Sequence, residues 1–80
     1  MTNEKEERAF LEAQLQWVKQ RDALLAQIEK KLYEMKHIAE LVAIEDAYML
    51  KNQKLKLNER FLQLQNEIAE LENKLQIFYN

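Results

Sequence analysis

The sequence predicts an all-α fold: an antiparallel two-helix hairpin, similar to a coiled coil, that dimerises into a four-helix bundle. Composition is the first reason, because the 80-residue chain has no glycine, proline or serine and is dominated by leucine, glutamate, lysine, alanine and glutamine, which are strong helix formers. The second reason is the heptad spacing of apolar residues in both halves. The third is a change of heptad phase near the middle, within LVAIEDAYML at residues 41–50.

The first half of the chain carries a broad apolar stripe at heptad spacing. One series repeats at the a positions of a heptad written abcdefg, and a second follows at d. A third series lies one place before a, at g, which makes the stripe wider than a two-stranded seam and favours a bundle. The a series is Leu11, Val18, Leu25, Leu32 and Ala39, the d series includes Ile28, Met35 and Val42, and the g series includes Phe10, Trp17, Leu24 and Ile38.

The second half has a cleaner heptad whose phase differs by one residue. Its a positions are Phe61, Ile68 and Leu75, and its d positions are Leu50, Leu57, Leu64, Leu71 and Phe78. Extending the first register into this half would place charged residues in the core. A reversal of the chain explains the slip, so we expect one hairpin domain over residues 1–80. Its helices would span about 4–43 and 47–78, with a turn at about 43–47.

Polar residues at the expected helix ends can cap them. Asn3 with Glu6 forms a capping box at the start, and Asp46 is the best cap for the second helix. Asn52 or Asn58 is an alternative cap, which would move the bend to about 51–57. An uninterrupted helix is the remaining alternative, since no glycine is available for a tight turn.

A reversal near residue 44 would pair residues whose numbers sum to about 88, such as Phe10 with Phe78, Trp17 with Leu71 and Leu24 with Leu64. Two helices alone would leave one flank of the broad stripe exposed, which forgoes stabilisation comparable with that of a small domain. A second copy would cover it, giving a homodimer. The residues expected in the core or interface are Trp17, Leu25, Ile28, Leu32, Met35, Phe61, Leu64, Ile68 and Leu71.

The inventory of side chains argues against an enzyme. Serine and cysteine nucleophiles and glycine-rich phosphate loops are excluded by composition, and no cofactor site is expected. Glu34 and His37 form an ExxH pair of the kind that binds di-metal centres in helix bundles. Their heptad positions, c and f, point to solvent, so we expect no metal site.

Basic residues concentrate around the expected bend, where residues 30–60 hold seven bases against five acids in a chain of net charge −2. Lys51, Lys54, Lys56 and Arg60 would carry an alternative function, in which a small helical bundle binds RNA. Acids interleave with these bases at helix spacing, which favours a solvated face over a nucleic-acid site.

A second apolar strip lies away from the expected seam, at Tyr48, Leu55 and Leu62. Such strips commonly mark an interface, so we expect these residues to form a partner surface. The leading prediction is a non-enzymatic protein–protein interaction module, structural or regulatory, that binds itself and one further protein through apolar helix faces. No signal peptide or membrane span is evident in the sequence, and we expect a cytoplasmic location.

The stretches LQWVKQRDALLAQIEKKLYEMKHIAE and LQNEIAELENKLQ resemble small coiled-coil proteins of Gram-positive, spore-forming bacteria, over roughly residues 15–75. The most distinctive part is KLYEMKHIAE. The group has no assigned activity, so the resemblance implies a bacterial origin and a helical hairpin, and nothing about mechanism.

Overall fold

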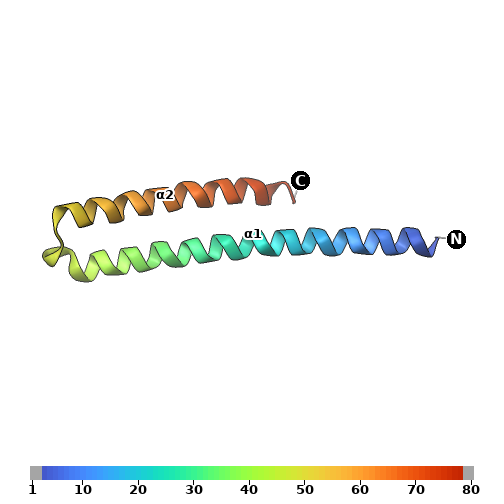
Figure 1. The fold of residues 1–80 in the computed structure, drawn as a ribbon, viewed down its shortest axis with the longest axis horizontal. Coiled ribbons are helices and arrows are strands. Elements are labelled where there is room, and N and C mark those ends of the chain that lie inside the picture. Colours follow the sequence, from blue (N-terminus) through green and yellow to red (C-terminus); the bar gives the residue numbers. More distant parts are fainter. Residues whose placement is uncertain (1–2, 79–80) are drawn as a thin grey trace.

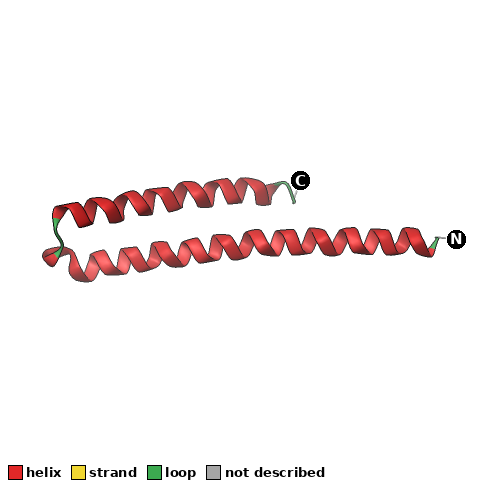
Figure 2. Cartoon of the chain, in the orientation of Figure 1, coloured by secondary structure: helices red, strands yellow, loops and turns green. Residues whose placement is uncertain are grey.

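The computed structural model describes residues 3–78 as two helices joined by a short turn (Figures 1 and 2). Helix α1 spans Glu4–Glu45, a single 3-10 turn η1 spans Asp46–Tyr48, and helix α2 spans Lys51–Gln76. The two helices lie side by side in opposite directions, within an elongated molecule of 71 × 18 × 14 Å. The structure therefore confirms the predicted all-α, two-helix hairpin.

Helix α1 begins where the sequence predicts. Asn3 is its N-cap, with an extended backbone and a side-chain oxygen that accepts a hydrogen bond from the backbone N–H of Lys5 at 3.0 Å. The first turn contains Glu4, Glu6 and Glu7, whose negative charges are favourable near the positive end of the helix dipole. The charged start of the chain therefore suits the start of a helix.

The turn lies later than the predicted 43–47. Helix α1 continues to Glu45, and η1 is followed by two extended residues, Met49 (φ −81°, ψ 138°) and Leu50 (φ −68°, ψ 149°), before α2 starts at Lys51. No residue from 3 to 78 has a positive φ. A reversal built from a 3-10 turn and two extended residues needs no left-handed residue, which explains how the chain turns without glycine.

Asp46 does not cap α2, contrary to the prediction, and neither Asn52 nor Asn58 does. Leu50 is the N-cap, and its backbone carbonyl accepts the N–H groups of Gln53 and Lys54 at 3.0 and 3.1 Å. The Gln53 side chain in turn accepts the Leu50 N–H at 3.2 Å. Asp46 instead forms an ion pair with Lys54, 3.0 Å across the turn.

The later turn shifts the pairing of the helices by about one heptad from the predicted register. Trp17 meets Phe78 rather than Leu71, with ring centroids 5.5 Å apart. Further along, the Lys31 Nζ lies 3.0 Å from a Glu67 carboxylate oxygen. Residues that face each other have numbers that sum to about 94–100 instead of about 88, so the expected pairs Phe10–Phe78 and Leu24–Leu64 are wrong.

The core is a narrow seam between the helices. Ile28, Ile68 and Leu71 form its centre, flanked by Leu24, Met35 and Leu75, and Leu64 is completely buried. The α2 side uses the predicted a and d positions. The α1 side uses d and g instead of a and d, so the predicted core residues Leu25 and Leu32 lie outside the seam and are 41% and 51% exposed.

Candidate interaction surface

The two flanks of the hairpin differ in chemistry. Because α1 faces α2 through its d and g positions, its a positions point out along one flank of the hairpin, roughly at right angles to the seam. We call this side the apolar flank. It comprises Leu11, Val18, Leu25, Leu32 and Ala39 of α1 together with Leu55 and Leu62 of α2.

The opposite side carries ion pairs, and we call it the ionic flank. The Arg60 guanidinium donates to both carboxylate oxygens of Glu34, at 2.8 and 3.2 Å, and lies 3.8 Å from Glu67. Lys31 completes the group through its 3.0 Å contact with Glu67. The hydrogen bonds to Glu34 raise the pKa of Arg60, desolvation opposes this in part, and the charges of Glu34 and Glu67 add to the rise. These ion pairs link α1 to α2 on the side of the hairpin opposite the a positions of α1.

A groove marks the apolar flank near the bend. The residues that line it are Ile38, Ala39, Val42 and Ala43 of α1 and Lys54, Leu57, Asn58 and Phe61 of α2. Small alanine side chains on α1 leave this groove open. Ala39 is an a position of α1, and Phe61 and Asn58 are a and e positions of α2. Their presence in one groove shows that these positions of the two helices face the same side of the hairpin, as the heptad geometry requires.

The predicted partner surface is exposed throughout. Tyr48 in the turn is 88% exposed, and Leu55 and Leu62 are each 51% exposed. The two leucines lie one heptad apart at b positions of α2, so they extend the apolar flank rather than forming a separate strip. Tyr48 lies at the end of the rod, next to the turn.

Helix α1 is longer than α2, and its first part projects beyond the hairpin (Figure 1). The Trp17–Phe78 contact marks where α2 ends along α1, so residues 4–16 form an overhang of about 20 Å, at about 1.5 Å per residue. Within the described residues, this overhang has no neighbouring helix. A groove lined by Phe10, Ala13, Gln14, Trp17 and Val18 continues the line of the seam along it.

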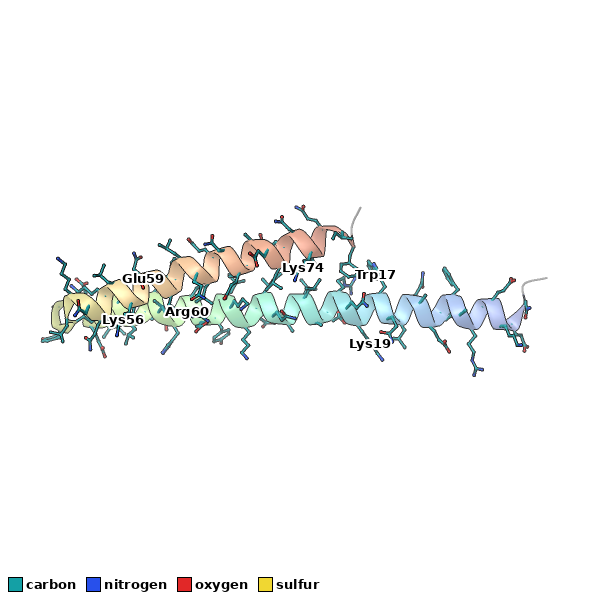
Figure 3. The ribbon with its side chains drawn as sticks, turned by 45° about the horizontal axis from the view of Figure 1, so that its top comes forward. Trp17, Lys19, Lys56, Glu59, Arg60 and Lys74 are labelled. Atoms are coloured by element: carbon teal, nitrogen blue, oxygen red, sulfur yellow. The ribbon has the colours of Figure 1, made fainter. Side chains whose placement is uncertain are left out.

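Trp17 lies at the junction between overhang and hairpin, where its side chain points toward the end of α2 (Figure 3). The Arg21 guanidinium lies over the Trp17 ring, 5.2 Å from its centroid, and also reaches Asp22 at 3.4 Å. Its Nε is buried without a hydrogen-bond partner in the described chain. Arg21 and Lys31 were not predicted as seam residues, although their d and g positions would have indicated this.

The predicted basic cluster is partly neutralised within the hairpin. Lys54 pairs with Asp46, and Arg60 pairs with Glu34 and Glu67. Lys51 and Lys56 complete the cluster, and the side chains of Lys56, Glu59 and Arg60 alternate in sign along α2 (Figure 3). Two of the four predicted RNA-binding residues therefore have carboxylate partners, which lowers the positive potential available to a phosphate backbone.

Glu34 and His37 are both exposed on α1, and Glu34 is engaged by Arg60. Across residues 3–78, no three His, Asp or Glu side chains gather closely enough to hold a metal ion. Neither α1 nor α2 contains, within these residues, an uncharged apolar stretch of the length needed to span a bilayer.

The molecule exposes much more surface than a compact protein of its size. Its accessible surface is 7006 Å² for a mass of 9.7 kDa, whereas a typical folded monomer of this mass exposes about 5,100 Å². The excess of about 1,900 Å² is more than twice the roughly 800 Å² that each partner buries in a standard protein–protein interface. The hairpin therefore has ample surface for another polypeptide to cover.

Comparisons of this chain with protein-family models, curated proteins and solved structures found no match.

Proposed function

We propose that the hairpin is a non-enzymatic protein–protein interaction module that buries its apolar flank against other helices, in a four-helix bundle of two copies. The observation that carries the proposal is the exposure of the a series of α1. Leu11, Leu25 and Leu32 stand in line on one flank and are 63%, 41% and 51% exposed, while the opposite flank is bridged by ion pairs.

The small core supports the same proposal. Five residues are buried in the described chain, namely Ile28, Ile38, Leu64, Ile68 and Leu71. A two-helix hairpin with so few buried side chains gains little hydrophobic stabilisation to offset the conformational entropy of ordering its residues. The flank leucines Leu11, Leu25 and Leu32 are 41–63% exposed, so covering each of them would add roughly half of the about 1.5–3 kcal/mol that complete burial of an exposed leucine gives.

The proposal is tested by the concentration dependence of thermal unfolding, followed by circular dichroism. If folding is coupled to association, the melting temperature rises with protein concentration. The variant Leu32→Glu places a charge in the proposed interface and is expected to remove this dependence. Tyr33→Glu is the matched control, because Tyr33 is the next residue, is 70% exposed and points away from both α2 and the apolar flank.

A melting temperature independent of concentration for the unaltered chain would contradict the proposal. Equal effects of Leu32→Glu and Tyr33→Glu on the concentration dependence of the melting temperature would also contradict the proposal. The apolar flank would then be no more sensitive to an added charge than the rest of the surface. A gel shift with mixed RNA at physiological salt would indicate the RNA-binding function instead.

A further inference from the structure

We propose that the partner on the apolar flank is a second copy lying antiparallel to the first, so that the bend end of each hairpin covers the overhang of the other. The bend end is residues 46–60, and the overhang is residues 4–16. This inference rests on the proposed function and adds the orientation of the two copies and the residues that meet.

The a series of α1 permits an antiparallel contact along its whole length. Its members are spaced evenly about Leu25, with Val18 and Leu32 seven residues to either side and Leu11 and Ala39 fourteen. Two α1 helices that cross antiparallel at Leu25 therefore bring apolar residues to the same level at every heptad, with Val18 of one copy level with Leu32 of the other. The two-fold symmetry axis of an isologous dimer would pass close to Leu25.

The unequal lengths of α1 and α2 favour this orientation. Residue 25 lies near the middle of α1 (Glu4–Glu45), so antiparallel copies overlap along the full rod. Because α2 stops level with Trp17, the overhang has an empty place beside it. In the antiparallel arrangement, α2 of the second copy runs along the rod from the opposite end. Its first turns then lie level with the overhang of the first copy and cover the position that α2 of the first copy leaves empty. In a parallel arrangement both overhangs project from the same end, and both lack an α2 helix.

The register of the hairpin identifies which residues would meet. Within one hairpin, the numbers of facing residues sum to about 96, a value that lies between 95 for Trp17 with Phe78 and 98 for Lys31 with Glu67. Applying the two-fold at Leu25 brings Leu55 and Leu62 of the second copy level with about residues 9 and 16. Leu55 and Leu62 are exposed on the apolar flank, and the overhang presents the groove between Phe10 and Trp17 at the same levels.

Charge favours the same orientation. The overhang contains four acids and two bases, and the bend end contains four bases and two acids. The α1 residues beside the bend end, 36–45, add one base and two acids, so this end of the hairpin keeps a net charge of +1. Antiparallel copies place each acidic overhang beside a basic bend end, with Lys51 of one copy level with Glu4 and Glu7 of the other. Parallel copies place the two bend ends together and the two overhangs together, which is unfavourable by like-charge repulsion.

Pulsed electron–electron resonance on spin-labelled single-cysteine variants tests the orientation, and the cysteine-free chain is a suitable background. Lys30→Cys places a label near the proposed two-fold, and Ile44→Cys places one near the bend. Both residues are exposed and lie off the apolar flank. For antiparallel copies the Ile44 labels would be about 57 Å apart, at about 1.5 Å per residue over 38 positions. The Lys30 labels would be about 15 Å apart along the axis, at about 1.5 Å per residue over 10 positions.

Short distances at both sites in a dimer would overturn the antiparallel orientation while leaving the proposed function in place. A monomeric mass with no dipolar coupling at either site would overturn both. The far-ultraviolet circular dichroism of each labelled variant shows whether it keeps the helical fold of the unaltered chain. If Ile44→Cys fails to fold, Gln16→Cys replaces it, because Gln16 is also exposed and lies on the other side of the proposed two-fold. Its labels would be about 27 Å apart along the axis, at about 1.5 Å per residue over 18 positions, in antiparallel copies and level with each other in parallel copies.

Discussion

Trp17 and Phe78 pack edge to face, with ring centroids 5.5 Å apart and ring planes at 65°, and this contact fixes where α2 ends along α1. It joins the only tryptophan of the chain to the segment that follows the last turn of α2. Everything in α1 that precedes Trp17 projects beyond the hairpin. The register of the two helices and the length of the overhang therefore depend on this contact and on the turn at the other end.

The Trp17–Phe78 contact should be measurable as a coupling energy. Edge-to-face aromatic pairs contribute about 0.5–1.5 kcal/mol beyond the area they bury. A double-mutant cycle with Trp17→Ala and Phe78→Ala, followed by urea unfolding, is expected to give a coupling of this size. Strictly additive effects of the two substitutions would mean that the rings do not interact in solution.

Leu64 and Leu62 offer a matched test of burial on α2. Leu64 is completely buried in the seam, whereas Leu62 is half exposed on the apolar flank. Leu64→Ala is expected to lower the free energy of unfolding by about 2–5 kcal/mol, through lost apolar burial and the cavity left behind. Leu62→Ala should lower the free energy of unfolding by much less, when measured at protein concentrations low enough to dissociate any assembly. Equal losses of unfolding free energy for the two variants at low concentration would contradict the burial of Leu64 between α1 and α2.

The ionic flank should contribute modestly to stability. Arg60 makes two hydrogen bonds to Glu34 but remains partly exposed, as do both carboxylates it contacts. Exposed ion pairs contribute about 0.2–1 kcal/mol and weaken with salt. Arg60→Gln should therefore lower the free energy of unfolding slightly in low salt, and by less in 1 M sodium chloride. Lys36→Gln, which removes a longer helix-spaced contact of 4.0 Å with Glu40, is the control and should change stability less. A loss for Arg60→Gln that is the same at both salt concentrations would contradict an electrostatic origin.

The turn can be tested with proline. Lys51 is the first residue of α2, and the preceding Leu50 has the extended backbone that a residue before proline requires. Proline is favoured at a first helical position, so Lys51→Pro should leave the stability of the hairpin nearly unchanged. Lys56→Pro, within α2, should cost about 3 kcal/mol or more. If the chain were one continuous helix, both substitutions would be severe, and equal large losses of helical circular dichroism would contradict the turn.

The two-helix fold could be predicted because two independent properties of the sequence agree. The composition favours helices and excludes tight glycine turns, and the heptads of the two halves need different phases. The change of heptad phase located the reversal only approximately. It shows that one heptad register ends and another begins in this region, but it does not show at which residue the backbone turns. The actual turn depends on the extended conformation of Met49 and Leu50 and on the Gln53 side chain that binds the Leu50 N–H. An apolar residue at the N-cap is not a sequence signal for a helix start.

The placement of Leu25 and Leu32 could not be predicted from α1 alone. That helix has three apolar columns, at a, d and g, and a single partner helix can cover only two of them. The structure covers d and g, where Ile28, Met35 and Ile38 face α2 and Lys31 reaches Glu67. Which two of the three columns α1 uses depends on α2, because the g positions of α2 supply Arg60 and Glu67. These residues pair with Glu34 and Lys31, which lie beside the seam on α1.

The central claim is that the exposed a series of α1 is buried in an assembly of two hairpins. Sedimentation equilibrium of the unaltered chain over a range of micromolar to millimolar concentrations tests it most directly. We predict a mass that rises to twice the 9.7 kDa of the chain, and one that stays at the single-chain value for Leu32→Glu. A single-chain mass at every concentration, with the helical circular dichroism intact, would contradict the claim.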